Sequence, residues 1–274
     1  IPLNQQLSSS GMSALDAIAA CAVDTEESTT LTRQNVAEIL FLSAGITKRR
    51  SYPGGEMLFR AAACTGALYH IDLYLVSGDL ADLEAGVYHF SPHDFALRRL
   101  RQGDYRGAVA RAAAAEPSLT KAQAIVISAS TYWRNAWKYQ SRAYRHCFWD
   151  NGTILANLLA AAAARKIAAK IVLGFVDSAL RELLSLDRER EAALSLVTLG
   201  YTHAENSMSY RSVEALSFDI EPLSKREIDY PMIRAMHDAS SLENEEEVTA
   251  WRLTRKIGGG EDASKRQARG IPAD

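Results

Sequence analysis

Lys138 and Tyr139 are adjacent in the chain, and together they could transfer protons. An ammonium group beside a phenol can serve as a proton donor and a proton acceptor. The pair follows an apolar run at residues 124–130, so we expect it to emerge at the edge of a sheet. The alternative is that Lys138 is a solvated surface charge whose stem covers apolar area.

A run of small residues, Cys64-Thr65-Gly66-Ala67, could lie against a flat ligand. Small side chains let a planar molecule approach the main chain, and Thr65 can offer its hydroxyl to a ring atom. A tight turn that leads into a strand is the alternative interpretation. Arg60 precedes this loop, and a guanidinium group there could bind phosphate oxygens.

Two further positions could contact a ligand or could be structural. Asn157 interrupts the apolar side of a predicted helix, and a buried amide without partners costs about 1–3 kcal/mol. It therefore binds either a neighbouring segment or a ligand. Gly174 and Phe175 end a predicted strand, where a main-chain amide can point at a ligand; a strand-to-helix turn explains them equally well.

Several classes of function have no support in the sequence. The six histidines are scattered without ligand-like spacing, so we expect no metal site. The motifs of dinucleotide folds, phosphate-binding loops and serine hydrolases are missing. A net charge of −2 creates no field that favours nucleic acid or an anionic membrane.

The remaining composition indicates a cytoplasmic protein. The longest apolar run, residues 154–164, is shorter than the roughly 20 residues that span a bilayer. Cys21, Cys64 and Cys147 lie far apart, which fits a reducing compartment. Because residue 1 is Ile rather than Met, we also expect a processed or excised piece of a longer polypeptide.

Interleaved helices and strands position these residues. The hydrophobic patterns predict a helix that follows Ser10 and others at residues 32–43, 103–115, 149–169 and 176–185. They predict strands at residues 68–76, 86–90, 95–100, 124–130, 170–175 and 192–199, and an exposed loop at 48–55. The hairpin at residues 86–100 excludes a wholly parallel sheet, so the predicted class is α+β with a mixed, largely antiparallel sheet.

Changes in composition along the chain divide it into three regions. Residues 1–203 form the main domain, and residues 204–256 are a polar extension with two short helices. Residues 257–274 lack apolar anchors, which predicts a flexible linker or tail.

Several segments in fixed order resemble the nitroreductase superfamily, in particular its SagB-type azoline dehydrogenase branch. They include R-A-A-A-C-T-G-A-L-Y-H-I-D-L-Y-L-V from Arg60, W-K-Y-Q-S-R-A-Y-R from Trp137 and D-N-G-T-I-L-A-N-L-L from Asp150, within about residues 35–201. The resemblance implies a nitroreductase-like α+β fold with helices flanking the sheet, binding FMN. It also implies a homodimer, or a second nitroreductase-like domain, with the flavin at the seam.

The resemblance assigns roles to individual residues. Lys138 and Tyr139 become the catalytic pair, with Tyr139 preferred as the base and the two roles exchangeable. The implied cofactor-binding residues are Ser13, Arg60, Ala63, Cys64, Thr65, Gly66, Leu68, Asn157, Gly174 and Phe175. Of the family's arginine-serine-arginine phosphate signature only Ser13 is present, and the basic pair after the last strand is missing unless Arg211 replaces it.

The implied reaction removes hydrogen from a thiazoline or oxazoline ring of a peptide, while FMN is reduced and oxygen reoxidises it. Two alternatives remain open. The first is a flavin-free scaffold domain that has lost its phosphate contacts. The second is an NAD(P)H-dependent reductase that acts on a small molecule, either a nitro compound or a quinone.

Overall fold

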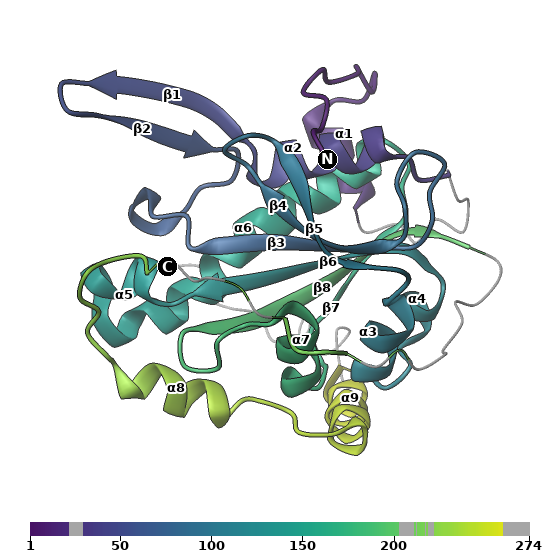
Figure 1. Cartoon of the computed structure of the whole chain (residues 1–274). Coiled ribbons are helices and arrows are strands. Elements are labelled where there is room, and N and C mark those ends of the chain that lie inside the picture. Colours follow the sequence, from purple (N-terminus) through teal and green to yellow (C-terminus); the bar gives the residue numbers. More distant parts are fainter. Residues whose placement is uncertain (22–29, 203–210, 212, 217, 219–221, 260–274) are drawn as a thin grey trace, which may run out of the picture.

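A six-stranded antiparallel sheet forms the centre of the protein (Figure 1). The computed structural model describes residues 1–21, 30–202, 211, 213–216, 218 and 222–259. The strands lie in the order β5-β4-β3-β6-β8-β7, and every neighbouring pair is antiparallel. The predicted α+β class is therefore confirmed.

All six predicted strands of this sheet are present. They are β3 (Ile71–Ser77), β4 (Gly86–Ser91), β5 (Ala96–Gln102), β6 (Ala122–Thr131), β7 (Ala169–Val172) and β8 (Glu191–Tyr201). β3 begins three residues later than its apolar pattern predicts. Ala67 and Tyr69 have φ values of 54° and 46°, and such left-handed backbone cannot join an extended strand.

The prediction of a loop at residues 48–55 is wrong, because these residues belong to a hairpin. β1 (Ile46–Tyr52) pairs with β2 (Gly55–Arg60), and the two strands project from the body of the protein (Figure 1). Pro53 and Gly54 make the connecting turn, where Gly54 has a φ of +96°. Only these two residues form the turn, and the charged residues on either side pair as strands.

Helices cover both faces of the central sheet. They are α1 (Ala14–Ala20), α2 (Arg33–Ala44), α3 (Arg106–Ala112), α4 (Pro117–Thr120), α5 (Trp133–Tyr139), α6 (Ala143–Ala164), α7 (Asp177–Leu184), α8 (Pro231–Asp238) and α9 (Glu245–Gly259). One core contains side chains of α2 and α6, and the other contains side chains of α3 and α7. Val126 of β6 faces the first core and Ile127 the second, as the alternation of a strand requires.

Two elements near the candidate site differ from the prediction. α6 begins at Ala143, six residues before the predicted start, because buried Tyr144 and Cys147 extend its apolar side. Lys138 and Tyr139 do not lie at a sheet edge. They end α5, which follows the interior strand β6.

The C-terminal part contains both predicted short helices, α8 and α9. α9 extends to Gly259, into the segment expected to be a linker, and residues 260–274 lie outside the described residues. A search of the described residues finds no helix with the length and apolar character needed to cross a bilayer.

Candidate active site

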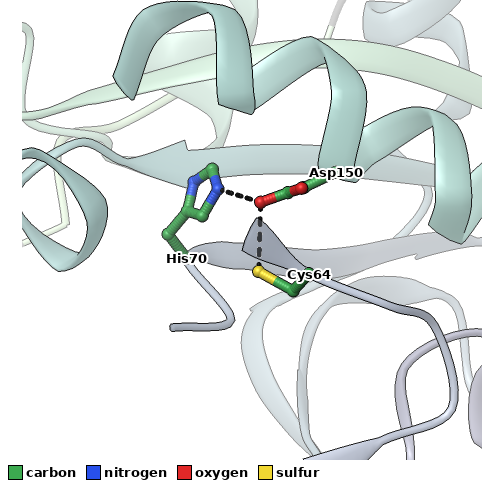
Figure 2. A group of neighbouring side chains, drawn as sticks. All are labelled: Cys64, His70 and Asp150. Atoms are coloured by element: carbon green, nitrogen blue, oxygen red, sulfur yellow. Dashed lines mark hydrogen bonds and ion pairs between the residues drawn. The ribbon is translucent and has the colours of Figure 1, made fainter. Parts of the chain in front are cut away.

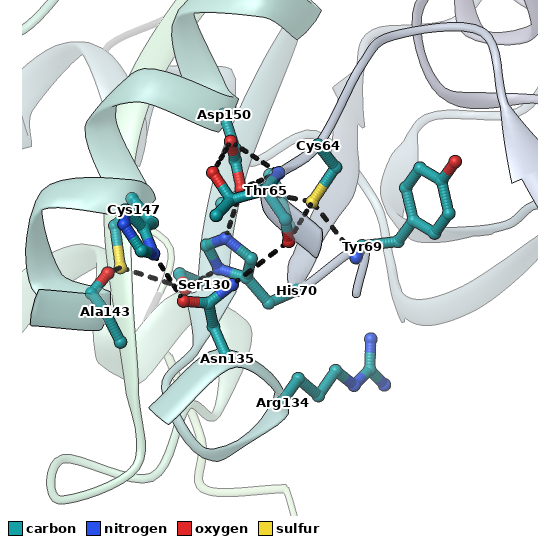
Figure 3. Close-up of polar contacts among 12 residues, drawn as sticks. Cys64, Thr65, Tyr69, His70, Ser130, Arg134, Asn135, Ala143, Cys147 and Asp150 are labelled. Atoms are coloured by element: carbon teal, nitrogen blue, oxygen red, sulfur yellow. Dashed lines mark hydrogen bonds and ion pairs between the residues drawn. The ribbon is translucent and has the colours of Figure 1, made fainter. Parts of the chain in front are cut away.

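The loop between β2 and β3 is fastened to α6 by hydrogen bonds (Figure 3). The backbone N–H of Thr65 donates to both oxygens of Asp150 at 3.0 Å, and its hydroxyl donates to Oδ1 at 2.8 Å. Thr153 donates its hydroxyl to the carbonyl of Ala63 at 2.6 Å. The hydroxyl of Thr65, expected to meet a ligand, therefore holds the loop in place.

The backbone of this loop is strained. Gly66 has a φ of +67°, and Ala67 and Tyr69 also have left-handed backbone. For residues with a side chain this conformation costs about 1–2 kcal/mol each. Such strain persists only where the surroundings determine it, and it concentrates at functional sites. The bonds to α6 provide that constraint.

The structure brings Lys138 and Tyr139 onto this loop. A Cβ atom added at Gly66 would lie 2.8 Å from the hydroxyl of Tyr139 and 3.4 Å from Nζ of Lys138. The same Nζ lies 5.4 Å from the centroid of the Tyr139 ring. Lys138 is exposed and Tyr139 is half-buried, so a molecule that approaches Gly66 can reach both groups.

Two residues that the sequence analysis did not select hold Tyr139. The ring of His146 meets the Tyr139 ring edge-on at 4.7 Å, and its Nδ1 lies 2.8 Å from Oδ1 of Asn135. The amide nitrogen of Asn135 donates to the carbonyl of Thr65 at 3.5 Å. Asn135 precedes Tyr139 by one helical turn, so the two share a face of the helix. That spacing was the sequence signal that could have identified Asn135. Nothing in the sequence distinguished His146 from the other histidines.

Beneath the loop lies a buried polar cluster (Figure 2). Nε2 of His70 and Sγ of Cys64 lie 2.8 Å and 3.1 Å from Oδ2 of Asp150. Burial alone would raise the pKa of Asp150, but hydrogen bonds from His70, Cys64 and Thr65 outweigh it and lower the pKa to about 2. Burial, then Asp150, raises the pKa of Cys64 to about 12, so the thiol is protonated and is no free nucleophile.

Arg60 is occupied by protein groups. Its Nη1 donates to the carbonyl of Ile71 at 3.0 Å, and its guanidinium carbon lies 5.5 Å from the Tyr69 ring centroid. With Ala63 and Cys64 it lines a cavity of about 10 Å³, which holds no more than one water molecule. Leu68 is half-buried at the end of the loop.

Two other predicted cofactor residues lie elsewhere and have structural partners. Ser13 caps α1, where it accepts from the N–H of Asp16 and donates to its carboxylate at 2.7 Å. That carboxylate opposes a phosphate at the same position. Asn157 donates to the carbonyl of Leu42 at 3.2 Å, which joins α6 to α2.

Gly174 and Phe175 follow β7 and have different neighbours from the loop residues. A Cβ atom added at Gly174 would lie 2.7 Å from the ring of Trp251 in α9. Phe175 is 4% exposed and belongs to the core beneath α3 and α7. Trp251 therefore covers Gly174, on the side where a Cβ would project.

These residues fit the ring of FMN better than its phosphate. The exposed main chain at Ala63 and Gly66, beside Lys138 and Tyr139, suits one face of a planar ring. The basic groups predicted to take the phosphate are engaged, since Arg211 donates to the carbonyl of Gln102 at 2.8 Å. Arg60 and Arg211, the two arginines considered for the phosphate, therefore both donate to backbone carbonyls.

Comparisons with known proteins agree with this fold. Residues 26–201 match the model of the "Nitroreductase family". A nitroreductase-like protein of Methanocaldococcus jannaschii is 26% identical over 173 residues, which cover 63% of this chain and 82% of that protein. A structure of a nitroreductase-like protein from Anabaena variabilis has a TM-score of 0.65 and 25% identity over 77% of this chain.

The matched structures differ in how much of their length this chain spans. It spans 43% of the Anabaena protein, which is less than half. The Escherichia coli microcin synthetase McbBCD complex, solved with truncated pro-MccB17 bound, matches with a TM-score of 0.54 and 20% identity. That match covers 74% of this chain and 76% of the other, and it shows the fold alone.

The nitroreductase match covers more than half of the chain, including the loop at Gly66 and the pair Lys138 and Tyr139. Members of this family are flavin oxidoreductases. The chain belongs to the nitroreductase family.

Proposed function

We propose that this chain is part of an FMN-dependent oxidoreductase that dehydrogenates azoline rings of a modified peptide, with oxygen as the final acceptor. The observation that carries the proposal is the position of Lys138 and Tyr139 over Gly66, on a strained and firmly held loop. The likeness to a microcin synthetase complex with pro-MccB17 bound supports a peptide substrate.

Aromatisation of an azoline ring removes one hydride and one proton. FMN, when bound, supplies the hydride acceptor. The ammonium of Lys138 stabilises the phenolate form of Tyr139 by its charge, and this phenolate takes the proton and becomes a neutral phenol. Asn135 and His146 fix the direction of the phenol, and the main chain at Gly66 supports the reacting rings.

A second nitroreductase-like domain, from another copy or from a longer chain, completes the site. It supplies cations for the FMN phosphate, because Ser13 carries no charge and Arg60 is bound to protein groups. Losing two or three charge-assisted contacts, each worth about 1.5–3 kcal/mol, would otherwise weaken FMN binding by orders of magnitude. The Anabaena structure, of which this chain spans 43%, supports an assembly larger than this domain.

The test uses the complete protein and a peptide that carries a thiazoline ring. Mass spectrometry should show the loss of two hydrogens per ring, and Tyr139→Phe and Lys138→Ala should each abolish it. Trp137→Phe, at an exposed neighbouring position, is the matched control and should keep the activity. Full activity in both variants of the pair would refute the proposal.

A flavin-free scaffold is the second candidate, favoured by the carboxylate of Asp16 beside Ser13. It predicts colourless protein and no effect of Lys138→Ala on any activity of the assembly. Rapid reduction of bound flavin by NAD(P)H without peptide turnover would instead indicate a nitro or quinone reductase.

A further inference from the structure

Cys64, His70 and Asp150 place three ligand atoms of different chemistry in one small space (Figure 2). A thiol sulfur, an imidazole nitrogen and a carboxylate oxygen all lie within 4.8 Å of one another. His70 is fully buried and Asp150 is 4% exposed, whereas Cys64 is half-buried. Cys64 and His70 belong to the loop between β2 and β3, and Asp150 belongs to α6.

We propose that these three side chains bind a single zinc ion, with a water molecule as the fourth ligand. Cysteine, histidine and aspartate are all zinc ligands, and three protein ligands leave one position open. The mixed sulfur, nitrogen and oxygen set disfavours magnesium and calcium, which select oxygen. The inference does not depend on the proposed FMN chemistry.

The two distances to Oδ2 of Asp150 require a small expansion, whereas Nε2 of His70 and Sγ of Cys64 lie within 4.8 Å of each other. Zinc bonds measure about 2.0–2.3 Å, so tetrahedral ligand atoms lie roughly 3.3–3.7 Å apart. Nε2 of His70 and Sγ of Cys64 now lie 2.8 Å and 3.1 Å from Oδ2 of Asp150. Each contact therefore lengthens by about half an ångström, as hydrogen bonds give way to bonds with the ion.

The protons balance in this exchange. Cys64 loses its thiol proton to solvent, because the thiolate is the zinc ligand. When zinc binds Nε2 of His70, the ring carries its proton on Nδ1 and donates it in a hydrogen bond to the hydroxyl of Ser130, which lies 2.8 Å away. The thiolate and the Asp150 carboxylate together carry two negative charges, which offset the charge of the ion.

Hydrogen bonds already orient each ligand. Both polar groups of Thr65 donate to Oδ1 of Asp150, and its N–H also donates to Oδ2, the oxygen that faces His70 and Cys64. The N–H of Tyr69 donates to the Cys64 sulfur at 3.1 Å, which favours the thiolate. Partners of this kind fix ligand direction in zinc sites.

The open position has a place in the fold. The cavity of about 10 Å³ beside Cys64 and Asp150 is the size of one water molecule. Arg60 also lines this cavity, and its Nη1 donates to the carbonyl of Ile71 at 3.0 Å. Zinc at this position would tie the loop that carries Gly66 to α6.

The experiment titrates full-length, chelator-treated protein with Zn²⁺, and with Co²⁺ as a spectroscopic probe. We expect one ion per chain, a thiolate-to-cobalt absorption band, and a Tm that rises with free zinc. Cys64→Ser keeps a donor to Asp150 but removes the sulfur. It should abolish the band and weaken zinc binding by more than about 100-fold, beyond the usual effect of losing a residue that only orients a ligand.

Cys21→Ser is the matched control, since Cys21 lies in the cap of α1, and it should leave the band and affinity unchanged. His70→Gln offers a second test through the nitrogen ligand. Wild-type protein without the band, or Cys64→Ser with wild-type zinc affinity, would overturn the proposal.

Discussion

The loop at Gly66 and the strand end at Gly174 were both expected to contact one flavin, but the structure gives them opposite surroundings. Gly66 is exposed, and the space where a Cβ would project is taken by the hydroxyl of Tyr139, beside Nζ of Lys138. At Gly174 the same space is filled by the ring of Trp251, and Phe175 is buried in the core. One region presents exposed main chain beside two polar side chains, whereas the other is a junction within the protein.

The comparison shows that a glycine at the end of an element has two distinct uses. At Gly66 the missing side chain leaves room for chemical groups, and at Gly174 it leaves room for an aromatic ring of a helix more than 70 residues away. The local sequences are similar in kind, so only the tertiary partners distinguish them. Four experiments test this contrast.

The largest expected effect is that of Asp150→Ala on the loop region. The carboxylate accepts from Thr65, His70 and Cys64, and hydrogen bonds to charged groups contribute about 1.5–3 kcal/mol each. We expect urea unfolding to show a loss of at least about 3 kcal/mol. Exposed Asp94→Asn is the control and should leave the midpoint unchanged. A change in Asp150→Ala as small as the control's would contradict the proposed anchoring.

Gly174→Ala should destabilise the second region next. The new Cβ meets the Trp251 ring at 2.7 Å, so α9 must shift, and overpacking of this kind costs about 1–3 kcal/mol. In a Trp251→Ala background the same change should cost much less, which a double-mutant cycle measures. Equal costs in both backgrounds would show that Trp251 does not constrain Gly174.

Gly66→Ala should have a smaller effect on stability but a large one on function. Alanine at a φ of +67° costs about 1–2 kcal/mol, and its Cβ displaces the Tyr139 hydroxyl. Under the proposed mechanism, dehydrogenation falls by at least about 100-fold, the contribution typical of a positioned acid or base. Turnover assays of Gly66→Ala and Gly174→Ala sharpen the comparison, and equal activity losses would erase it.

The smallest effect is a pH dependence that belongs to the loop region. The folded pKa of Asp150 is about 2, below an unfolded value of roughly 3.9, so its stabilisation is present above pH 4. That stabilisation is lost as the pH falls through about 2. Thermal melts between pH 5 and 2 should show a steeper decline for wild type than for Asp150→Asn. At Glu38, too, hydrogen bonds outweigh burial and lower the pKa to about 2. Glu38 is present in both proteins, so it does not account for a difference between their curves. Parallel curves would argue against a charged, hydrogen-bonded Asp150.

The spacing of apolar residues and the helix caps predicted much of the fold, because both depend on residues that are close together in the sequence. The alternation of Ile71, Leu73 and Leu75 marks a strand, and Thr32 begins α2 with reciprocal side-chain caps to Asn35. The charged hairpin β1 and β2 was missed, since it buries little apolar surface and leaves no alternating pattern.

The candidate site also has parts that the sequence predicted and parts that it did not. Its loop and its Lys138 and Tyr139 pair were predicted as separate motifs, but their meeting at Gly66 depends on α5 folding back beyond β6. The contact between His70 and Asp150 joins residues 80 positions apart, and no spacing rule indicates it. Tertiary closure creates such clusters, so periodicity does not report them.

The most direct test of the proposed function is an absorbance scan from the near ultraviolet to the blue, on freshly purified protein with the proposed second nitroreductase-like domain supplied. The account predicts a flavin spectrum, with FMN released on denaturation, in wild type and in Gly174→Ala. Gly66→Val should have lost it. Colourless wild-type protein that takes up no added FMN would contradict the claim that a planar cofactor rests on this loop beside Tyr139.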